Sequence, residues 1–356
     1  MNAKIELQLF KEKIEKLLEK YLTEQTEKAE KVSPYCGEML NNVKDMTMRG
    51  GKRIRAAILY YSYLAFGGKD KERAMKVAMS MELMQTYLLV HDDIIDSDDM
   101  RRGGLSMHKT YENICEERYA GKTNPKSFGN SVAILAGDVA CALSNKIIAE
   151  SGFSDRSVVR AIIELNHMYT KEVNGEFLDT LSELRDDIAK EDVILTHQLK
   201  TVPYTFDSPL KIGAMLAGAN DKTIEKINEY TVPLGVAFQI QDDILGMFGT
   251  EEKLGKPVTS DLREGKRTLL VLDALMKASE SEKQIISSAL GNKRINISDV
   301  NKVRQIIRDT GALEKSQDTA TAFVKESMSA LDKLKLKKEG KEFLLGIAEY
   351  MIKREY

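Results

Sequence analysis

Residues Leu83–Gly103 read LMQTYLLVHDDIIDSDDMRRG, and the rest of the chain is best interpreted from this stretch. An apolar run ends in five aspartates within eight residues: Asp92, Asp93, Asp96, Asp98 and Asp99. Two carboxylates about 4 Å apart repel each other by about 4 kcal/mol at an effective dielectric constant near 20. The cluster therefore requires cations, and the two arginines that follow supply too few.

The spacing of these acids points to a metal. If Met81–Asp96 is helical, Asp92 and Asp96 lie one turn apart on one face, with Asp93 beside them. Mg²⁺ prefers one or two carboxylates, several waters and a substrate phosphate. We expect Arg101 and Arg102 to grip the oxygens of such a phosphate. A solvated helix end with unrelated acids is the alternative, and a second acidic site further along the chain argues against it.

Composition limits the class of protein. The chain has 356 residues, 42% apolar and 30% charged, with a net charge of −2, which fits a globular protein and makes nucleic acid an unfavoured partner. Three cysteines without metal spacing indicate reduced thiols. Residues 1–13 do not resemble a signal or transit peptide. No run of 18 apolar residues occurs, since Asp138 and Lys146 interrupt the best candidate, residues 132–148. We expect a cytoplasmic protein without a membrane span.

Apolar residues recur at helical spacing through most of the chain. The expected helices are residues 4–31, 37–48, 56–66, 71–92, 131–150, 157–184, 190–217 and 232–249, with a helical remainder over 269–356. Residues 113–129, which contain Gly121, Asn124, Pro125 and Gly129, predict an exposed loop. No strand-like alternation is sustained. The expected fold is all-α, a single domain over residues 1–356 in which one large helical bundle surrounds a central cavity.

Basic residues cluster at Arg49–Arg55, which reads RGGKRIR. Two glycines and four cations before a helix could cradle an anion, because the free N–H groups of a helix start point the same way. Lys52 and Arg55 are three residues apart and share a face. A positively charged surface turn explains the pattern equally well. Gln85, one polar group among apolar neighbours, is either a core amide or a ligand contact.

A second apolar helix also ends in acids. Residues 232–249 read VPLGVAFQIQDDILGMFG, with Gln239 one turn before Asp242 and Asp243 beside it. Lys200 and Thr201 precede Pro203, and a kink there would point both inward; a surface lysine is the alternative. Gly255-Lys256 and Gly265-Lys266 look like a flexible flap over an anion.

The two acidic helix ends are about 150 residues apart in the chain and could face each other across a bundle cavity. Mg²⁺ between them would bind one diphosphate, and Lys52, Arg55 and Arg102 would bind a second. The apolar helix interiors would take a hydrocarbon tail. Such a site favours ionisation, because cations stabilise a leaving diphosphate and a dry pocket protects a carbocation from water.

Together these motifs resemble the trans-isoprenyl diphosphate synthase family, which includes farnesyl and geranylgeranyl diphosphate synthases. The resemblance covers about Gly50 to Lys266 and rests on five motifs in the family's order. They are GGKRIR, Asp92–Gly103, Lys200-Thr201, Phe238–Asp243, and Gly255-Lys256 with Lys266. The short-chain archaeal-type geranylgeranyl diphosphate synthases are the most similar group.

The resemblance implies a function and a role for each motif. The reaction is the Mg²⁺-dependent 1′-4 condensation of isopentenyl diphosphate with allylic diphosphates, in an all-α homodimer. Three Mg²⁺ ions would bridge the allylic diphosphate to Asp92, Asp96 and Asp242, with Asp93 also in the catalytic motif. The remaining implied contacts are to the allylic diphosphate (Arg101, Lys200, Lys256, Lys266), to isopentenyl diphosphate (Lys52, Arg55, Gln85, Arg102) and to the carbocation (Thr201, Gln239).

Two positions depart from the family pattern. Gly246 stands where many members have a third aspartate, which predicts one weaker metal contact. Glu176, after Gly175, stands where many members have glutamine, and the sequence offers no account of its effect.

Product length depends on Tyr87 and Leu88, five and four residues before Asp92. In the family, bulk at these positions forms the floor of the chain cavity. One aromatic residue at the farther position implies a C20 product, geranylgeranyl diphosphate, and a C15 product is the alternative. A class I terpene cyclase and a regulatory synthase subunit are further alternatives. A cyclase needs no second diphosphate site, and a regulatory subunit is expected to have lost acids or lysines.

Overall fold

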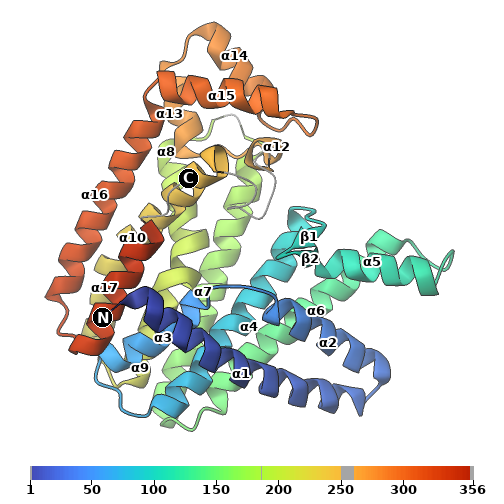
Figure 1. Cartoon of the computed structure of the whole chain (residues 1–356), viewed down its shortest axis with the longest axis vertical. Helices are drawn as coiled ribbons and strands as arrows, with labels where there is room; N and C mark the ends of the chain where they lie inside the picture. Colours follow the sequence, from blue (N-terminus) through green and yellow to red (C-terminus); the bar gives the residue numbers. More distant parts are fainter. Residues whose placement is uncertain (1, 186, 250–259, 353–356) are drawn as a thin grey trace. The chain divides into compact units, whose positions relative to one another are not determined.

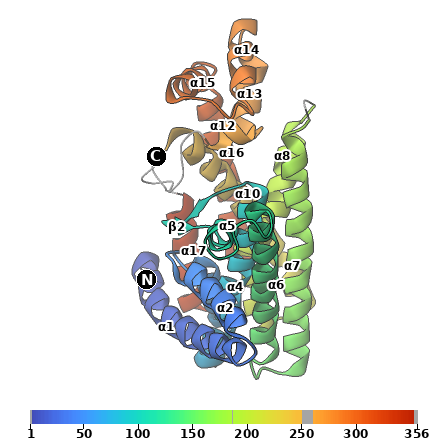
Figure 2. The same cartoon turned by 90° about the vertical axis from the view of Figure 1, so that its right-hand side faces the viewer.

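The computed structural model describes residues 2–185, 187–249 and 260–352, and these are almost entirely helical (Figures 1 and 2). The predicted all-α class is confirmed. The contacts divide the chain into two compact units. Unit 1 comprises Met1–Ile163, Ile212–Gly218 and Lys337–Phe343, and unit 2 comprises Glu164–Lys211, Ala219–Leu336 and Leu344–Tyr356. That the whole chain acts as one synthase domain remains a prediction.

Unit 1 is built around α4, whose middle turns are buried on all sides. Its described elements are α1 (Ala3–Glu30), α2 (Pro34–Met48), α3 (Ile54–Ala65), α4 (Lys71–Ile95), the hairpin β1 (Met100–Arg101) and β2 (Gly104–Leu105), α5 (Met107–Arg118), α6 (Pro125–Ala149) and the first turns of α7 (Asp155–Ser182). Parts of α9 (Ser208–Leu216) and α17 (Lys338–Ile352) complete it. Asn2 and Asp70 begin α1 and α4 by accepting hydrogen bonds from free backbone N–H groups.

Small side chains allow α6 to pack closely against α4. Ala133, Ala136 and Ala140 are fully buried in one hydrophobic cluster with Val90 of α4. A side chain on Gly137 would collide with the ring of His91. The acidic end of α4 is therefore held at a fixed position against α6.

The predicted loop over residues 113–129 is wrong. Helix α5 continues to Arg118, and α6 begins at Pro125, with the Asn124 side chain accepting a hydrogen bond from the Ser127 N–H. A side chain on Gly129 would collide with the His108 carbonyl, so this glycine serves close packing between α5 and α6. The polar residues in this segment lie on solvent-facing sides of helices, and only a short turn containing Gly121 separates the two.

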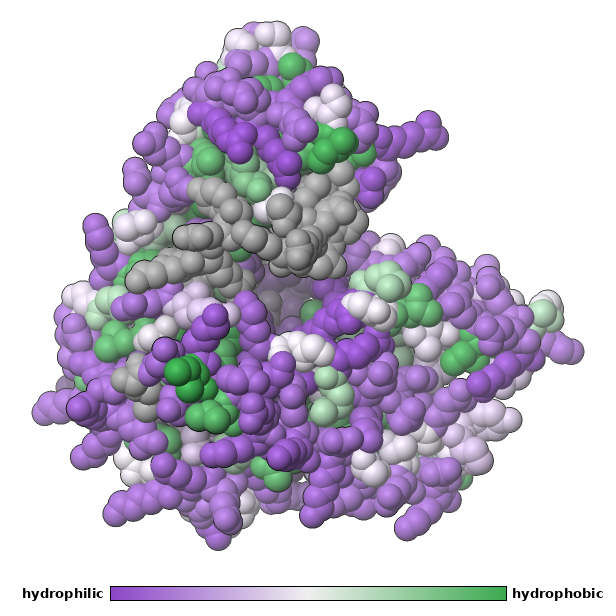
Figure 3. Space-filling view, viewed as in Figure 1, coloured by the Kyte–Doolittle hydropathy of each residue, from purple (hydrophilic) through white to green (hydrophobic). Residues whose placement is uncertain are grey.

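Helix α6 is the one candidate membrane span among the described helices, with a mean hydropathy of 1.6 over its most apolar window. However, 44% of that window is buried inside the protein, against α4 and α5. A single helix that meets criteria of length and apolar composition is weak evidence for a membrane span. The face shown in the space-filling view is mostly hydrophilic, with apolar residues scattered over it (Figure 3).

Unit 2 contains the rest of α7 and the other acidic helix, α10 (Asp221–Phe248). Its other described elements are α8 (Lys190–Thr196), the π-helical turns η1 (His197–Thr201) and η2 (Pro203–Asp207), α12 (Ser260–Glu264), α13 (Leu269–Lys277), α14 (Glu280–Ala289), α15 (Ile297–Asp309) and α16 (Ala312–Lys333). Helices α10 and α16 pack along each other (Figure 1). The expected interruption at Pro203 takes the form of η1 and η2, wider helical turns that frequently occur at functional sites.

Gly246 stands where many family members have a third aspartate, and the space beside it is occupied by another side chain. The carboxylate of Asp261, on α12, fills the space that a side chain on Gly246 of α10 would occupy. A side chain at position 246 would therefore require the Asp261 carboxylate to move.

A buried ion pair holds the start of α3 in place. Arg53 is 3% exposed and adopts a left-handed backbone conformation before the first turn. Its guanidinium donates to Glu82 of α4 at 2.8 Å and to Glu15 of α1 at 3.0 Å.

We expect Arg53→Met to lower the free energy of unfolding by about 3–5 kcal/mol, because Glu82 would keep a buried charge without its partner. Urea denaturation followed by circular dichroism measures this loss. The exposed neighbour Lys52 is the control: Lys52→Met should change the free energy by less than about 0.5 kcal/mol, and equal losses in the two variants would contradict the assignment.

The contact between Gly246 and Asp261 gives a second test of the packing. Gly246→Ala should lower the free energy of unfolding by about 1 kcal/mol, because the new methyl group must displace the Asp261 carboxylate. Adding Asp261→Ala should recover most of this loss. A double-mutant cycle in urea measures the coupling between the two sites, and purely additive losses would show that the two positions do not compete for space.

Candidate active site

The carboxyl end of α4 carries the first acidic group. Asp92 and Asp96 are half-buried and one turn apart, and Asp96 is the C-cap residue of the helix. The dipole of a helix is negative at this end, so carboxylates here are doubly unfavourable without a cation. Two partly exposed carboxylates that offer only oxygen ligands fit the preferences of Mg²⁺. The structure therefore agrees with the predicted face formed by Asp92 and Asp96.

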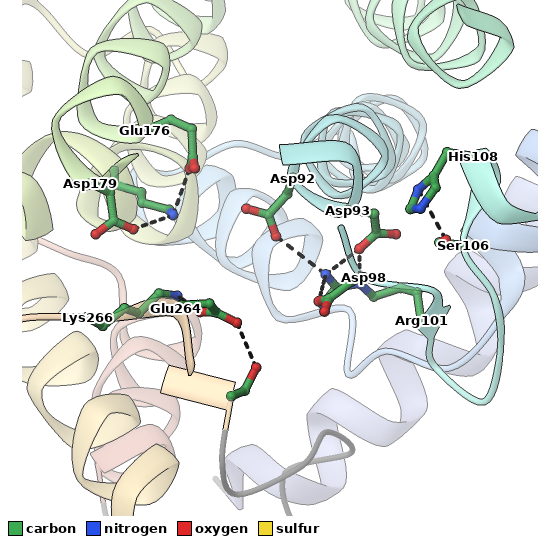
Figure 4. Close-up of polar contacts among 12 residues, drawn as sticks. Asp92, Asp93, Asp98, Arg101, Ser106, His108, Glu176, Asp179, Glu264 and Lys266 are labelled. Carbon is green, nitrogen blue, oxygen red and sulfur yellow. Dashed lines mark hydrogen bonds and ion pairs between the residues drawn. The ribbon is translucent and has the colours of Figure 1, made fainter. Parts of the chain in front are cut away.

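Asp93 lies on the other side of the helix end and is fully buried. It forms an ion pair with Arg101, whose guanidinium also lies 3.5 Å from Asp92 and 3.2 Å from Asp98 (Figure 4). Burial raises the pKa of Asp93 to about 6, and the charge of Arg101 opposes that rise. The hairpin β1–β2 that carries Arg101 is anchored by the backbone hydrogen bond from Ser106 to Asp99. Asp93 thus positions Arg101, which the sequence assigned to a diphosphate.

Cations gather where the sequence predicted an anion cradle. Gly50 and Gly51 both have positive φ angles, 61° and 87°, so the backbone turns sharply before α3. The Arg102 guanidinium donates to the Arg49 carbonyl at 3.2 Å and lies against Gly51. Burial lowers the pKa of Arg102, and nearby arginines, including Arg55, lower it further. This concentration of positive charge favours an anion at the same place.

Lys52 and Gln85 complete the predicted set for a second anion. Lys52 is exposed at the start of α3, whereas Gln85 of α4 is 8% exposed. The amide oxygen of Gln85 has no hydrogen-bond partner among the described residues. A buried amide oxygen without a partner is costly, and a bound ligand or water would satisfy it. The structure thus leaves open the role in ligand contact that the sequence suggested for Gln85.

In unit 2, Lys200 lies beside two acids of α7. Its ammonium nitrogen is 2.7 Å from a Glu176 oxygen and 2.6 Å from an Asp179 oxygen (Figure 4). Gly175 permits this approach, since a side chain there would collide with the Lys200 backbone. Burial alone would raise the pKa of Asp179, but Lys200 and Lys266 hold it below its ordinary value. Glu176, a departure from the family pattern, is therefore in direct contact with Lys200, a motif residue that the sequence analysis treated separately.

The motifs around Thr201 and α10 form one hydrogen-bonded chain. The Thr201 hydroxyl donates to the Gln239 amide oxygen at 2.7 Å, and the Gln239 amide nitrogen donates to Asp243 at 2.9 Å. His197 lies 3.4 Å from the other Asp243 oxygen. These contacts fix the orientation of the Gln239 amide and leave the lone pairs of the Thr201 oxygen unused by this bond. Asp242 is half-buried beside Asp243.

The flap prediction is only partly covered by the described residues. Lys256 lies outside them. Lys266 follows α12 and forms an ion pair with Glu264 at 3.0 Å (Figure 4). It also lowers the pKa of Asp179 through its charge, which places Lys266 in the electrostatic surroundings of Lys200.

The residues assigned to product length occupy different surroundings. Leu88 is 8% exposed, whereas Tyr87 is half-buried and packs edge-on against the His91 ring with centroids 4.7 Å apart. His91 in turn lies 3.3 Å from the Ile134 carbonyl of α6. Tyr87 is thus supported from α6 through His91.

Sequence reasoning missed two polar partners. His197 is 7% exposed and contacts Asp243, and Glu82 binds Arg53. His197 precedes Lys200 by three residues, and Glu82 precedes Gln85 by three. Both could have been found as polar residues one turn before a predicted site residue.

Three comparisons with known proteins agree with this geometry. The family model described as polyprenyl synthetase matches residues 37–307. A geranylgeranyl diphosphate synthase of Saccharolobus solfataricus is 34% identical over 308 residues, covering 86% of this chain and 87% of that protein. A geranylfarnesyl diphosphate synthase of Aeropyrum pernix is also 34% identical, covering 86% and 91%.

The fold comparison gives the same assignment. The crystal structure of a geranylgeranyl pyrophosphate synthase from Corynebacterium glutamicum, complexed with isoprenyl diphosphate and magnesium, is similar with a TM-score of 0.90 and 30% identity. It covers 97% of this chain and 99% of that one. The protein therefore belongs to the polyprenyl synthetase family of Mg²⁺-dependent, all-α prenyltransferases, which condense isopentenyl diphosphate with allylic diphosphates.

Proposed function

We propose that this prenyltransferase makes geranylgeranyl diphosphate, a C20 product, by successive additions of isopentenyl diphosphate to allylic diphosphates. The observation that carries the proposal is the separation of two anion-binding groups within unit 1. One is the acidic end of α4, suited to metal-bound diphosphate; the other is the group of cations around Gly50 and Gly51. Two such groups fit a reaction that joins two diphosphates.

We assign the acidic residues to Mg²⁺, which supplies charge neutralisation for the departing diphosphate. Asp92, Asp96 and Asp242 would hold three ions. Their half-buried carboxylates fit this role because each can exchange water for metal. Asp93 has a different task, since its buried ion pair with Arg101 keeps that guanidinium at the helix end.

The basic residues would divide between the two substrates. Arg101, Lys200, Lys256 and Lys266 would bind the allylic diphosphate, and Lys52, Arg55, Gln85 and Arg102 would bind isopentenyl diphosphate. The guanidinium groups suit this task because they stay charged when buried and bind phosphate oxygens in pairs.

Thr201 and Gln239 would stabilise the allylic carbocation. Because the Thr201 hydroxyl donates a hydrogen bond to the Gln239 amide oxygen, its own oxygen can direct a lone pair towards positive charge. Asp243 holds the amide of Gln239 in the matching orientation. The double bond of isopentenyl diphosphate then attacks C1 of the cation. A proton is lost from the adduct to the released diphosphate.

The alternatives differ in what they require of these residues. A class I terpene cyclase binds one diphosphate and would leave the cations around Gly50 and Gly51 without a task. A regulatory subunit would not need the hydrogen bonds that orient Thr201 and Gln239 here. A C15 product, and the C25 product named for the Aeropyrum pernix relative, differ only in chain length.

We further propose a cytoplasmic homodimer. Ile134 and Leu135 on α6 are 46% and 56% exposed, and Val159 and Ile163 on the first turns of α7 are equally accessible. Burying such residues against a second copy would stabilise a dimer. Sedimentation at several protein concentrations measures the assembly directly.

Product analysis tests the proposed reaction. The protein is incubated with Mg²⁺, labelled isopentenyl diphosphate and, in turn, dimethylallyl, geranyl or farnesyl diphosphate, and products are separated by chain length. We expect a C20 diphosphate from each starter. Release of inorganic diphosphate from the allylic substrate alone, without condensation, would favour the cyclase instead.

The floor assignment predicts that Tyr87→Ala lengthens the product beyond C20. Removing the ring opens space that the growing chain can enter, while the diphosphate-binding residues are unchanged. The same chain-length separation measures this effect, and Tyr87→Phe, which keeps the ring, is the control. An unchanged product distribution in Tyr87→Ala would contradict the assignment.

A further inference from the structure

The contacts of Lys200 give Glu176 a role that the family pattern does not supply. Lys200 carries one positive charge, and two carboxylates, Glu176 and Asp179, lie within 2.7 Å of its ammonium. The three groups together carry a net charge of −1 when all are ionised. A diphosphate that approaches Lys200 therefore meets an ammonium already paired with two carboxylates, and Lys266 offsets only part of this negative charge through its effect on Asp179.

The two carboxylates do not hold the lysine in the same way. Asp179 accepts a well-formed hydrogen bond from the ammonium, and its lowered pKa reflects the charges of Lys200 and Lys266. One carboxylate is enough to neutralise and orient a lysine. Glu176 is the second, and its side chain is only 13% exposed, so water screens its charge weakly.

Local packing brings Glu176 close to the lysine. Gly175 lets α7 approach the η1 backbone at Lys200, so the neighbouring Glu176 lies within reach of the Lys200 ammonium. Glu176 and Asp179 are three residues apart on α7 and therefore share the face that meets the lysine. A glutamine at position 176 would have the same shape and could still accept a hydrogen bond, but it would carry no charge.

We propose that Glu176 is a positioning residue that competes with the allylic diphosphate for Lys200 and thereby weakens the binding of this substrate. The inference rests on the proposed function, in which Lys200 binds that diphosphate. Competition of this kind lowers the affinity for the substrate and equally favours release of the product's diphosphate group. The chain thus has a built-in limit on how tightly it retains its lengthening substrate.

The test compares Glu176→Gln with the unmodified protein in two measurements. Steady-state kinetics with farnesyl diphosphate should give a KM for the allylic substrate about three- to tenfold lower in the variant, with the KM for isopentenyl diphosphate unchanged. Calorimetric titration with inorganic diphosphate at fixed Mg²⁺ should show a matching gain in affinity. Because the Glu176 carboxylate is largely shielded from water, most of the gain should persist between about 20 and 300 mM salt.

Two further variants make the result specific. Asp318→Asn, at an exposed position on α16, removes the same charge away from Lys200 and should change neither constant. In a Lys200→Ala background, Glu176→Gln should lose most of its effect, because the competed group is absent. A gain in affinity that persists without Lys200 would overturn the proposal.

Other outcomes also decide the question. A raised allylic KM together with a higher Mg²⁺ requirement would make Glu176 a metal ligand, and an unchanged KM would make its role structural; either overturns the proposal. If the unmodified protein condenses no starter, the proposed function fails, whereas the titration with inorganic diphosphate still tests the competition at Lys200. Equal melting temperatures of the unmodified protein and Glu176→Gln exclude a folding defect as the cause.

Discussion

The accumulation of carboxylates at the carboxyl end of α4 is the constraint on which the rest of the structure depends. The helix dipole and the mutual repulsion of the acids both oppose it. The protein compensates part of this cost through Arg101, which is bound to Asp93 and lies near Asp92 and Asp98. Asp92 and Asp96 are half-buried on the other face, where the Mg²⁺ of the proposed metal-bound diphosphate would add further positive charge.

The same principle operates with opposite sign before α3. Burial lowers the pKa of Arg102. The nearby positive charges of Arg53 and Arg55 lower this pKa further. Arg53 is paired internally with Glu82 and Glu15, which gives this arginine a structural role at the start of α3. One arginine of the GGKRIR motif is thus structural, although all its cations look alike in the sequence. Burial next to two acids, rather than residue type, distinguishes the structural Arg53 from the other cations of this motif.

Much of the fold could be predicted from periodicity, because long amphipathic helices depend on contacts within one or two turns. The segment 113–129 shows where this fails. Its glycine, proline and polar residues indicate a loop, but Gly129 serves close helix packing and Pro125 occupies the first turn of α6. Both residues are favourable in those positions, and only the neighbouring α5 reveals it. The π-helical turns around Pro203 were likewise visible only as an expected interruption.

The sequence by itself determined the all-α class, the two acidic helix ends and the residue types needed for two diphosphates, because these depend on local spacing and composition. Only the tertiary structure decided which of these residues meet. It placed Glu176 against Lys200, Asp261 in the space above Gly246, and His91 between Tyr87 and α6. Each contact joins elements that are distant in the chain or depends on a glycine that permits close approach. Such contacts are set by the packing of whole helices, which no local pattern encodes.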